Sequence, residues 1–350
     1  MNLGDQSLKG YQYTMECALE VTGEDAQSFL QSQFSNDLSK AEPLSTVYGL
    51  WLSIKGRVLA DSYIIVLSDN HYWILSEFTE AASIKDMLEK HLIADDVEIG
   101  ILESFGSIAL DEAGSESLIK CLGINATTEH VLASKKAYCD QSFGIIFTSD
   151  RFGSLSREFC FLNKGYAEKL ELMIARNLNT SPVLHLIDEN QMHLKRIELG
   201  RPLVPQEIGP GDLAAEGGFV PSAVSLTKGC YLGQEVVARL HHLGKAQRQL
   251  YILGLTPIDK RTDSEQAVDS TNAQVVFGSA ELPLSIEYEG RSIGQLRSVY
   301  NSNGGAYSSI AVALLKVRAL DCFKEGIILE GYTLTLIKAF AQPESSNNSH

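Results

Sequence analysis

Hydrophobic and polar positions alternate in short runs along the first part of the chain, and turn residues separate these runs. Alternation with a period of two predicts strands, and apolar stripes with a period near 3.6 predict helices. We expect strands over residues 11–21, 47–54, 57–67, 71–76, 97–103 and 107–111, and helices over 24–34 and 79–92, the second capped by Thr79. Helices packed on antiparallel sheets define an α+β fold.

A similar order of elements recurs further along, without a sequence repeat. The pattern there predicts helices over residues 116–122, 165–177 and 189–199, and strands over 131–138, 144–148 and 158–162. Residues 200–233 are rich in glycine and proline, which indicates a long irregular connection of the kind that usually carries function. Residues 1–245 are therefore predicted to form one α+β region.

The character of the sequence changes after Ala246. Strand-like runs over residues 249–255, 284–288, 292–300 and 307–317 are separated by turn signals such as Glu289-Gly290. Short strands with frequent turns favour a small β-barrel, so residues 246–341 are predicted to form a separate C-terminal domain. The Ser/Asn-rich residues 342–350 are predicted to be a disordered tail.

Composition weighs against several functional classes. A net charge of −15 disfavours direct binding of nucleic acid, which needs clustered Lys and Arg. One local group of basic residues (Arg239, His241, His242, Lys245 and Arg248) is interpreted as part of a solvated loop. The six cysteines contain no C-x-x-C pair, so no metal site is predicted. No secretory signal or membrane span is visible, so we expect a cytoplasmic protein without a membrane partner.

The best candidate for chemistry is Cys230, in the stretch Lys228-Gly229-Cys230-Tyr231-Leu232-Gly233. Two glycines bracket Cys230 and Tyr231 and let the backbone bend where other residues could not. A helix is predicted from Gln234 onward, so Cys230 would lie just before its N-terminus, with Lys228 nearby. The helix dipole and the ammonium would both favour a thiolate. The alternative is an ordinary buried cysteine in a glycine-rich connection.

The stretch from Lys228 to Arg239 resembles the signature of the YgfZ family, folate-binding relatives of the glycine-cleavage T-protein, an aminomethyltransferase. The resemblance extends to residues 196–207 and to the N-terminal residues 21–26 and 33–38. It implies two α+β lobes around a channel that holds tetrahydrofolate, followed by a C-terminal β-barrel domain.

The resemblance also implies which residues contact folate. Glu198, in Arg-Ile-Glu-Leu-Gly, is similar to a T-protein glutamate that is associated with the pterin ring. A carboxylate can accept two hydrogen bonds side by side from the pterin N–H groups. The alternative is an exposed glutamate in salt links with Arg196 and Arg201. Arg196 and Asp37 are further candidate contacts, and for Asp37 the alternative is a turn that ends the first helix.

The same resemblance marks the neighbours of Cys230 as functional. They are Lys228, Gly229, Tyr231, Gly233, Gln234, Glu235 and Arg239. Tyr231 could stack on a flat ligand or pack in the core. Glu235 and Arg239 have the i, i+4 spacing of an ion pair on a helix.

One position departs from the T-protein pattern. The catalytic aspartate of T-proteins lies in a Gly-Gly-x-x-Asp-Asp stretch, and the matching stretch here runs from Gly56 to Asp61 with Ala60 at the first acidic position. Alternation along a strand would send Ala60 and Asp61 to opposite faces. This departure disfavours aminomethyl transfer.

The resemblance therefore implies a tetrahydrofolate-binding protein that supports assembly or repair of iron–sulfur clusters in client enzymes, including enzymes that thiomethylate tRNA. Cys230 would be its key thiol. The alternatives are a folate-dependent aminomethyltransferase and a direct tRNA-binding protein. The sequence leaves open whether the chain catalyses a reaction.

Overall fold

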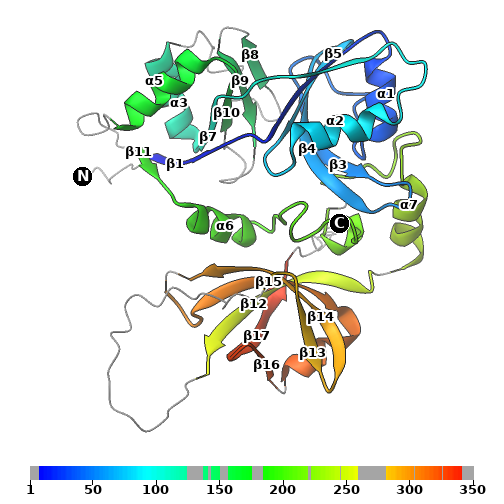
Figure 1. Ribbon diagram of the computed structural model, residues 1–350, viewed down its shortest axis with the longest axis vertical. Helices are drawn as coiled ribbons and strands as arrows, with labels where there is room; N and C mark the ends of the chain where they lie inside the picture. Colours follow the sequence, from blue (N-terminus) through cyan, green and yellow to red (C-terminus); the bar gives the residue numbers. More distant parts are fainter. Residues whose placement is uncertain are drawn as a thin grey trace, which may run out of the picture.

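The computed structural model describes residues 8–123, 137–140, 143–149, 157–175, 184–219, 222–244, 246–258, 281–302, 304–324 and 326–340. Two α+β lobes lie side by side, and a barrel-like sheet lies below them in the view of Figure 1. The predicted α+β fold with a C-terminal barrel is confirmed. The predicted tail, residues 342–350, lies outside the described residues.

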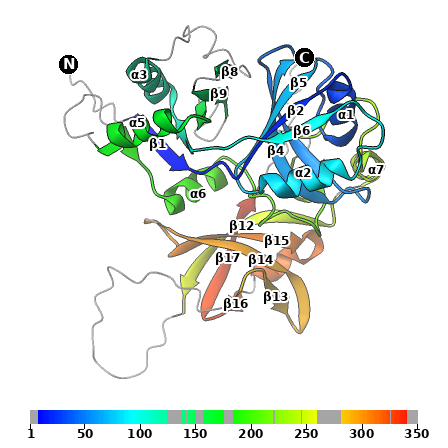
Figure 2. The same ribbon diagram turned by 45° about the horizontal axis from the view of Figure 1, so that its top comes forward.

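The first lobe is a five-stranded antiparallel sheet with two helices on one face. Its strands, in spatial order, are β3 (Thr46–Leu52), β4 (Val58–Ser68), β5 (His71–Ser76), β2 (Cys17–Thr22) and β6 (Glu98–Ile101). Helices α1 (Ala26–Gln33) and α2 (Ala81–Glu89) pack on this sheet (Figure 2), because Phe29, Leu30, Ile84 and Leu88 are buried in one cluster with Ile64 of β4. Burial of this apolar face is what fixes both helices on the sheet.

The start of α2 differs from the prediction. Its N-cap residue is Glu80, whose side chain makes no capping hydrogen bond. Thr79 lies one residue too early to cap the helix, and its hydroxyl oxygen is buried without a hydrogen-bond partner in the structure as described. The predicted cap by Thr79 is therefore wrong.

The second lobe is a six-stranded sheet with its own helices. In spatial order its strands are β11 (Leu184–Leu186), β1 (Leu8–Tyr13), β7 (Gly106–Leu110), β10 (Arg157–Phe161), β9 (Gly144–Thr148) and β8 (Ala137–Asp140). Helices α3 (Glu112–Leu122) and α5 (Lys164–Ala175) pack on it through a cluster that includes Leu118, Leu170 and Phe159. The predicted strand over residues 131–138 lies mostly outside the described residues.

The predicted single strand over residues 11–21 is wrong. The chain leaves the second lobe's sheet at Tyr13 and enters the first lobe's sheet at Cys17, so β1 and β2 belong to different lobes. Both halves alternate like strands, and the alternation does not reveal the change of sheet. Met15, at the crossing point, is buried in the cluster that joins the two sheets, together with Trp73 of β5 and Ile145 of β9.

The C-terminal sheet is a nearly closed barrel. Its strands, in spatial order, are β13 (Leu284–Tyr288), β14 (Arg291–Asn301), β15 (Ser309–Lys316), β12 (Arg248–Pro257), β17 (Tyr332–Ala339) and β16 (Ile327–Leu329), with the 3-10 helix η2 (Val317–Lys324) before β16. The sequence pattern did not predict β16 or β17. In β17 only Leu334 is fully buried, and Tyr332, Leu336 and Ala339 pack against the same barrel core while partly exposed.

The long connection fills the space between the lobes and the barrel. It starts at helix α6 (Glu189–Glu198), passes through the 3-10 turn η1 (Ala214–Glu216) and ends at helix α7 (Gln234–Leu243), as Figure 1 shows. One apolar cluster contains Leu50 of the first lobe, Val204 and Phe219 of the connection, and Ile252 and Leu314 of the barrel. The connection thus contributes to an apolar core that the first lobe and the barrel share. The Cys230 stretch lies at the end of this connection.

Candidate functional site

The loop from Lys228 to Gly233, called here the motif loop, lies against the first lobe. The amide of Leu232 donates to the carbonyl of Ser32 in α1 at 2.9 Å. Gly233 has φ +82°, and a Cβ there would lie 2.5 Å from the carbonyl oxygen of Ser53, so the predicted need for glycine is confirmed at this position. At Gly229 a Cβ would meet no atom within 4 Å, so the same prediction is wrong for Gly229.

Lys228 anchors the motif loop. Its ammonium donates to the carbonyls of Gln31, Phe34 and Asn36 at 2.7, 2.7 and 2.8 Å, at the C-terminal end of α1, where carbonyls lack helical partners. Burial lowers the pKa of Lys228 to about 8, and the nearby Asp37 carboxylate opposes this shift. All three ammonium donors are used. Lys228 therefore holds the loop, and its effect on the Cys230 thiol stays a prediction.

Cys230 is exposed, although its neighbours Lys228 and Tyr231 are both buried. Helix α7 begins four residues later, with Gly233 as its N-cap residue. The alternative that Cys230 is an ordinary buried cysteine is therefore wrong. The loop presents the thiol at the surface from a backbone that is fixed on both sides.

The other motif residues divide between core and surface. Tyr231 packs in the shared apolar core, with the Lys228 ammonium 5.0 Å from its ring centroid. The side-chain amide of Gln234 donates to the Lys228 carbonyl at 3.5 Å. Glu235 and Arg239 are exposed on α7. Of the two alternatives for Tyr231, packing in the core is thus the one observed.

We predict that Lys228→Met lowers the free energy of unfolding by about 2 kcal/mol, because it leaves three carbonyls without their charged donor. Methionine keeps most of the apolar chain against Tyr231. Urea unfolding of the two proteins measures the difference. Lys55→Met, at an exposed lysine in the β3–β4 turn, is the control and should change stability by less than about 0.5 kcal/mol. Equal stability of Lys228→Met and wild type would contradict the anchoring role.

Arg196 is buried at the junction of α6, the connection and the barrel. Its guanidinium makes a two-point ion pair with Glu207, at 2.8 and 2.6 Å. It also donates to the carbonyl of Arg201, the hydroxyl of Tyr300 and Nδ1 of His193, at 2.9 to 3.0 Å. These contacts use all five N–H donors of an arginine. The prediction that Arg196 contacts folate is not supported by this geometry, since no donor is left for a ligand.

Glu198 lies two residues further along α6 and is exposed. Its carboxylate pairs with Lys195 at 3.1 Å, and its side chain is 69% exposed. Glu198 is thus exposed, as the alternative expected, but it pairs with Lys195 and not with Arg196 or Arg201. With two carboxylate oxygens and one exposed lysine partner, Glu198 keeps acceptor capacity for a ligand.

Asp37 lies in a turn that ends α1. This is the arrangement that the alternative to a folate contact predicted. Its Oδ1 atom accepts from the side-chain amide of Gln31 at 2.9 Å and from the amide and hydroxyl of Ser39 at 3.0 and 2.7 Å. Burial acts to raise its pKa, but these hydrogen bonds hold the pKa below the ordinary value. The Asp37 carboxylate is thus engaged within its own turn.

Ala60 and Asp61 face opposite sides of β4, as predicted. Ala60 is 2% exposed and belongs to the core beneath the helices. Asp61 accepts a hydrogen bond at 2.7 Å from the hydroxyl of Tyr48 on β3. Burial, followed by the charge of Asp61, raises the pKa of Tyr48 well above its ordinary value, so its phenol remains a donor. The sheet face opposite the helices therefore carries one acid at this place.

Sequence reasoning missed a second group of buried ions. Asp212 lies 3.2 Å from Arg248 and 3.1 Å from Arg297, and Arg248 also pairs with Glu216 at 2.8 Å. The prediction that Arg248 belongs to a solvated basic group is wrong, and Lys245 lies outside the described residues. Acidic residues inside a glycine- and proline-rich connection are the only sequence signal for this cluster.

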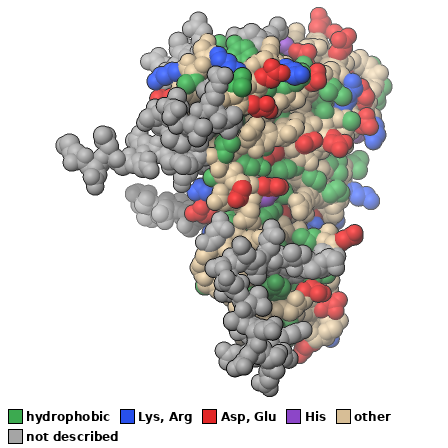
Figure 3. Space-filling model, turned by 60° about the vertical axis from the view of Figure 1, so that its left-hand side comes forward, with side chains coloured by type: hydrophobic (Ala, Val, Ile, Leu, Met, Phe, Trp, Pro, Cys, Tyr) green, Lys and Arg blue, Asp and Glu red, His purple; other side chains and the backbone are tan. Residues whose placement is uncertain are grey.

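Charge is spread over the face of the molecule that Figure 3 shows. On the face that Figure 3 shows, acidic side chains extend from the lobes to the barrel, and basic ones do not gather into one patch. Within the described ranges, no group of three or more His, Cys, Asp and Glu side chains is placed to hold a metal ion. None of the helices among these residues is both long and apolar enough to cross a membrane.

Comparison with known proteins adds to this geometry. Residues 11–129 match the family model of the GCVT N-terminal domain. The chain is 27% identical over 317 residues to an iron–sulfur cluster assembly factor IBA57 homolog, mitochondrial, from Cryptococcus neoformans, covering 84% of this chain and 82% of the relative. It is also 27% identical over 237 residues to the tRNA-modifying protein YgfZ of Colwellia psychrerythraea, covering 67% and 68% of the two chains.

A solved structure has the same fold. It is aminomethyltransferase T of the glycine cleavage system from Bartonella henselae, with a TM-score of 0.71, 16% sequence identity, and coverage of 96% of this chain and 87% of that chain. At this identity the likeness shows the fold alone. The resemblance that the motif loop indicated is confirmed: the chain is similar to proteins named YgfZ and IBA57 and has the aminomethyltransferase fold.

Proposed function

We propose that this protein binds tetrahydrofolate and supports the assembly or repair of iron–sulfur clusters in client enzymes, including enzymes that thiomethylate tRNA. The observation that carries this proposal is the exposed Cys230 thiol on the anchored motif loop. The names of two relatives, an iron–sulfur cluster assembly factor and a tRNA-modifying protein, support it. The proposed compartment is the cytoplasm, although the IBA57 relatives are named as mitochondrial.

Cys230 is the proposed key thiol. A thiolate is the form of cysteine that attacks a disulfide or binds iron. The Lys228 anchor and the close fit of Gly233 hold the loop, so a client could approach the thiol without first ordering the backbone. In this proposal the cluster belongs to the client enzyme, and Cys230 makes a transient contact with the client.

Cys230 is expected to react with iodoacetamide faster than any other cysteine in the chain. Cys17 and Cys160 are buried, and burial raises the pKa of Cys17 to about 12 and that of Cys160 above its ordinary value. Cys121, near the C-terminal end of α3, is the exposed competitor. Peptide mass spectrometry after brief labelling at neutral pH measures the order, with denatured protein as the control. Labelling of Cys121 at an equal or higher rate would show that the Cys230 thiol is not unusually reactive.

Glu198 is the proposed contact for the pterin ring of tetrahydrofolate. Its exposed carboxylate fits two adjacent N–H donors, and its present partner, Lys195, is itself partly exposed. Tetrahydrofolate would supply one-carbon chemistry when bound. The contribution of this chain would be to orient the pterin through Glu198.

We predict that Glu198→Ala weakens tetrahydrofolate binding at least tenfold, since each hydrogen bond to a charged group contributes about 1.5–3 kcal/mol. Titration calorimetry on both proteins measures the affinities. Glu168→Ala, at an exposed glutamate on α5, is the matched control and should bind like wild type. Equal affinities for Glu198→Ala and wild type would remove Glu198 from the site. Absence of binding in all three proteins would refute the folate proposal itself.

The alternative is a folate-dependent aminomethyltransferase, whose fold this chain shares. Against it stands Ala60, which is buried in the apolar core at the first acidic position of the T-protein pattern. The remaining acid, Asp61, lies on the other face of the strand and accepts the Tyr48 hydrogen bond. We therefore favour an accessory role over aminomethyl transfer.

A further inference from the structure

The turn between β3 and β4 packs directly against the motif loop and the start of α7, as Figure 1 shows. A Cβ at Gly233 would lie 3.0 Å from the Cα atom of Gly56, and a Cβ at Gly56 would lie 2.8 Å from the Cβ atom of Val236 on α7. Contacts this close leave no space for a side chain between the turn and the helix. The turn, the motif loop with its exposed Cys230 and α7 therefore form one continuous surface.

Ile54 lies in this turn, and 77% of its surface is exposed. The backbone that carries it is held in place, because the amide of Gly56 donates to the carbonyl of Ser53 at 2.8 Å and the amide of Ser53 donates to the carbonyl of Arg57 at 2.9 Å. The Arg57 guanidinium also donates to the carbonyl of Gly211 in the connection at 2.7 Å. An apolar side chain on a fixed turn can fill a partner's pocket with little loss of conformational entropy.

The charge on this surface differs in sign from that of the whole chain, which carries a net charge of −15. Lys55 on the turn and Arg239 on α7 are exposed, and neither has an ion-pair partner in the described part of the chain. Glu235 is the only acid in α7, and α1, on the other side of the motif loop, contains no charged residue. The charges of Lys228 and Asp37, which lie close together, offset each other. This surface therefore attracts negative charge.

We propose that the surface defined by Ile54, Lys55, Cys230 and Arg239, called here the docking face, binds an acidic segment of the client enzyme. Ile54 enters an apolar pocket of the client, Lys55 and Arg239 pair with carboxylates of the client, and this contact brings the client to the Cys230 thiol. The proposal rests on the proposed support of client enzymes and assigns the surface through which it acts.

The composition of the docking face favours a protein over RNA as the partner. Two exposed cations are far fewer than the clustered Lys and Arg residues of a nucleic-acid site. The exposed Ile54 side chain offers nothing to a phosphate backbone, whereas an apolar centre with a charged rim is the usual composition of a protein interface. The docking face therefore suits an acidic protein surface.

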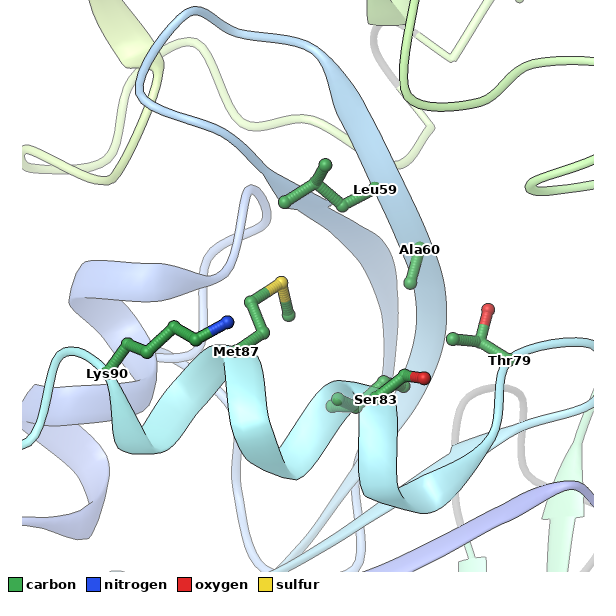
Figure 4. Close-up of a pocket in the computed structure, with 7 residues that line it drawn as sticks. Leu59, Ala60, Thr79, Ser83, Met87 and Lys90 are labelled. Atoms are coloured by element: carbon green, nitrogen blue, oxygen red, sulfur yellow. The ribbon is translucent and has the colours of Figure 1, made fainter.

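The first lobe also offers a client another place to bind, a hollow of about 240 Å³ between α2 and β4. Figure 4 shows Lys90 and Met87 of this hollow, with Leu59 and Ala60 across from them. None of the residues that line the hollow belongs to the docking face. Lys90 is exposed and lies on the same lobe, so it provides a matched control for reversal of charge.

The test measures the affinity of the full chain for a purified tRNA-thiomethylating iron–sulfur enzyme by surface plasmon resonance. Ile54→Ser should weaken binding about tenfold, because a few apolar anchors dominate protein interfaces. Arg239→Glu should also weaken it about tenfold, by repelling the acids of the client. Lys90→Glu should weaken it less than about twofold, since physiological salt screens charges separated by more than about 8 Å.

Ile93→Ser is the matched control for the apolar anchor. Ile93 is 93% exposed, and its loop after α2 contacts the start of α1, whereas the motif loop contacts the end of that helix. This variant should bind the client like wild type. Urea unfolding of all four variants should give wild-type stability, because each replaced side chain is exposed.

Equal client affinities for wild type, Ile54→Ser and Arg239→Glu would overturn the proposal, and so would the absence of client binding to wild type. A larger loss for Lys90→Glu than for Arg239→Glu would place the contact at the hollow and would also overturn it. The same holds if unmodified tRNA competes with the client and Arg239→Glu abolishes tRNA binding. The proposed function is tested separately, by the thiomethylation of tRNA in cells without the gene. A loss of thiomethylation there would support that function even if the docking face were wrong.

Discussion

Replacement of Arg196 by methionine is expected to lower the free energy of unfolding by about 3–5 kcal/mol, the usual loss when one partner of a buried ion pair is removed. Glu207 is completely buried and would be left with the Leu203 amide and the Ser298 hydroxyl as its remaining partners. The pair also joins α6 to the connection and the connection to β14, so its loss weakens the junction of lobes and barrel. Urea unfolding of wild type and variant measures the effect.

The matched control for this experiment is Lys195→Met on the same helix. Lys195 makes an exposed pair with Glu198, and its loss should cost less than about 1 kcal/mol. The double variant Arg196→Met with Glu207→Leu removes both charges and should recover part of the stability. If Arg196→Met were no less stable than Lys195→Met, the buried pair would not hold the junction.

The largest functional effect is expected from Cys230→Ser, which should abolish the support of client enzymes while the protein stays folded. An exposed side chain contributes little to stability, so the free energy of unfolding should change by less than about 0.5 kcal/mol. Serine keeps the size of cysteine and removes the thiolate. The readout is the activity of an iron–sulfur client enzyme in cells that lack the native protein.

Cys121→Ser provides the comparison, because Cys121 is also an exposed cysteine but lies on α3 of the second lobe. This variant should restore client activity as fully as wild type. If Cys230→Ser restored it equally well, the thiol would not be needed and the role assigned to the motif loop would be wrong.

Local patterns were enough to predict many elements of this fold. Strands over His71–Ser76, Gly144–Thr148 and Leu284–Tyr288 have the predicted bounds, and α6 ends within one residue of its prediction. In each case the hydrophobic period and a neighbouring turn signal indicate the same bounds for the element. The opposite orientation of Ala60 and Asp61 follows from the same alternation.

The failures involve partners that are distant in the sequence. The split between β1 and β2 depends on packing between two sheets, which a run of alternating residues does not report. The contacts of the Lys228 ammonium at the end of α1 were not predicted, because that helix lies nearly 200 residues away in sequence. Arg196 lies in a stretch that resembles a folate-binding sequence. Its partner Glu207 could be identified only once α6 and the connection were placed together.

If this protein supports iron–sulfur enzymes that thiomethylate tRNA, the modified tRNA itself reports on that role. Mass spectrometry gives the ratio of thiomethylated to unmodified tRNA in cells with and without the gene for this protein. We expect this ratio to fall when the gene is deleted and to recover when the wild-type chain is returned. An unchanged ratio in the deletion, with the client enzyme present at its normal level, would contradict it.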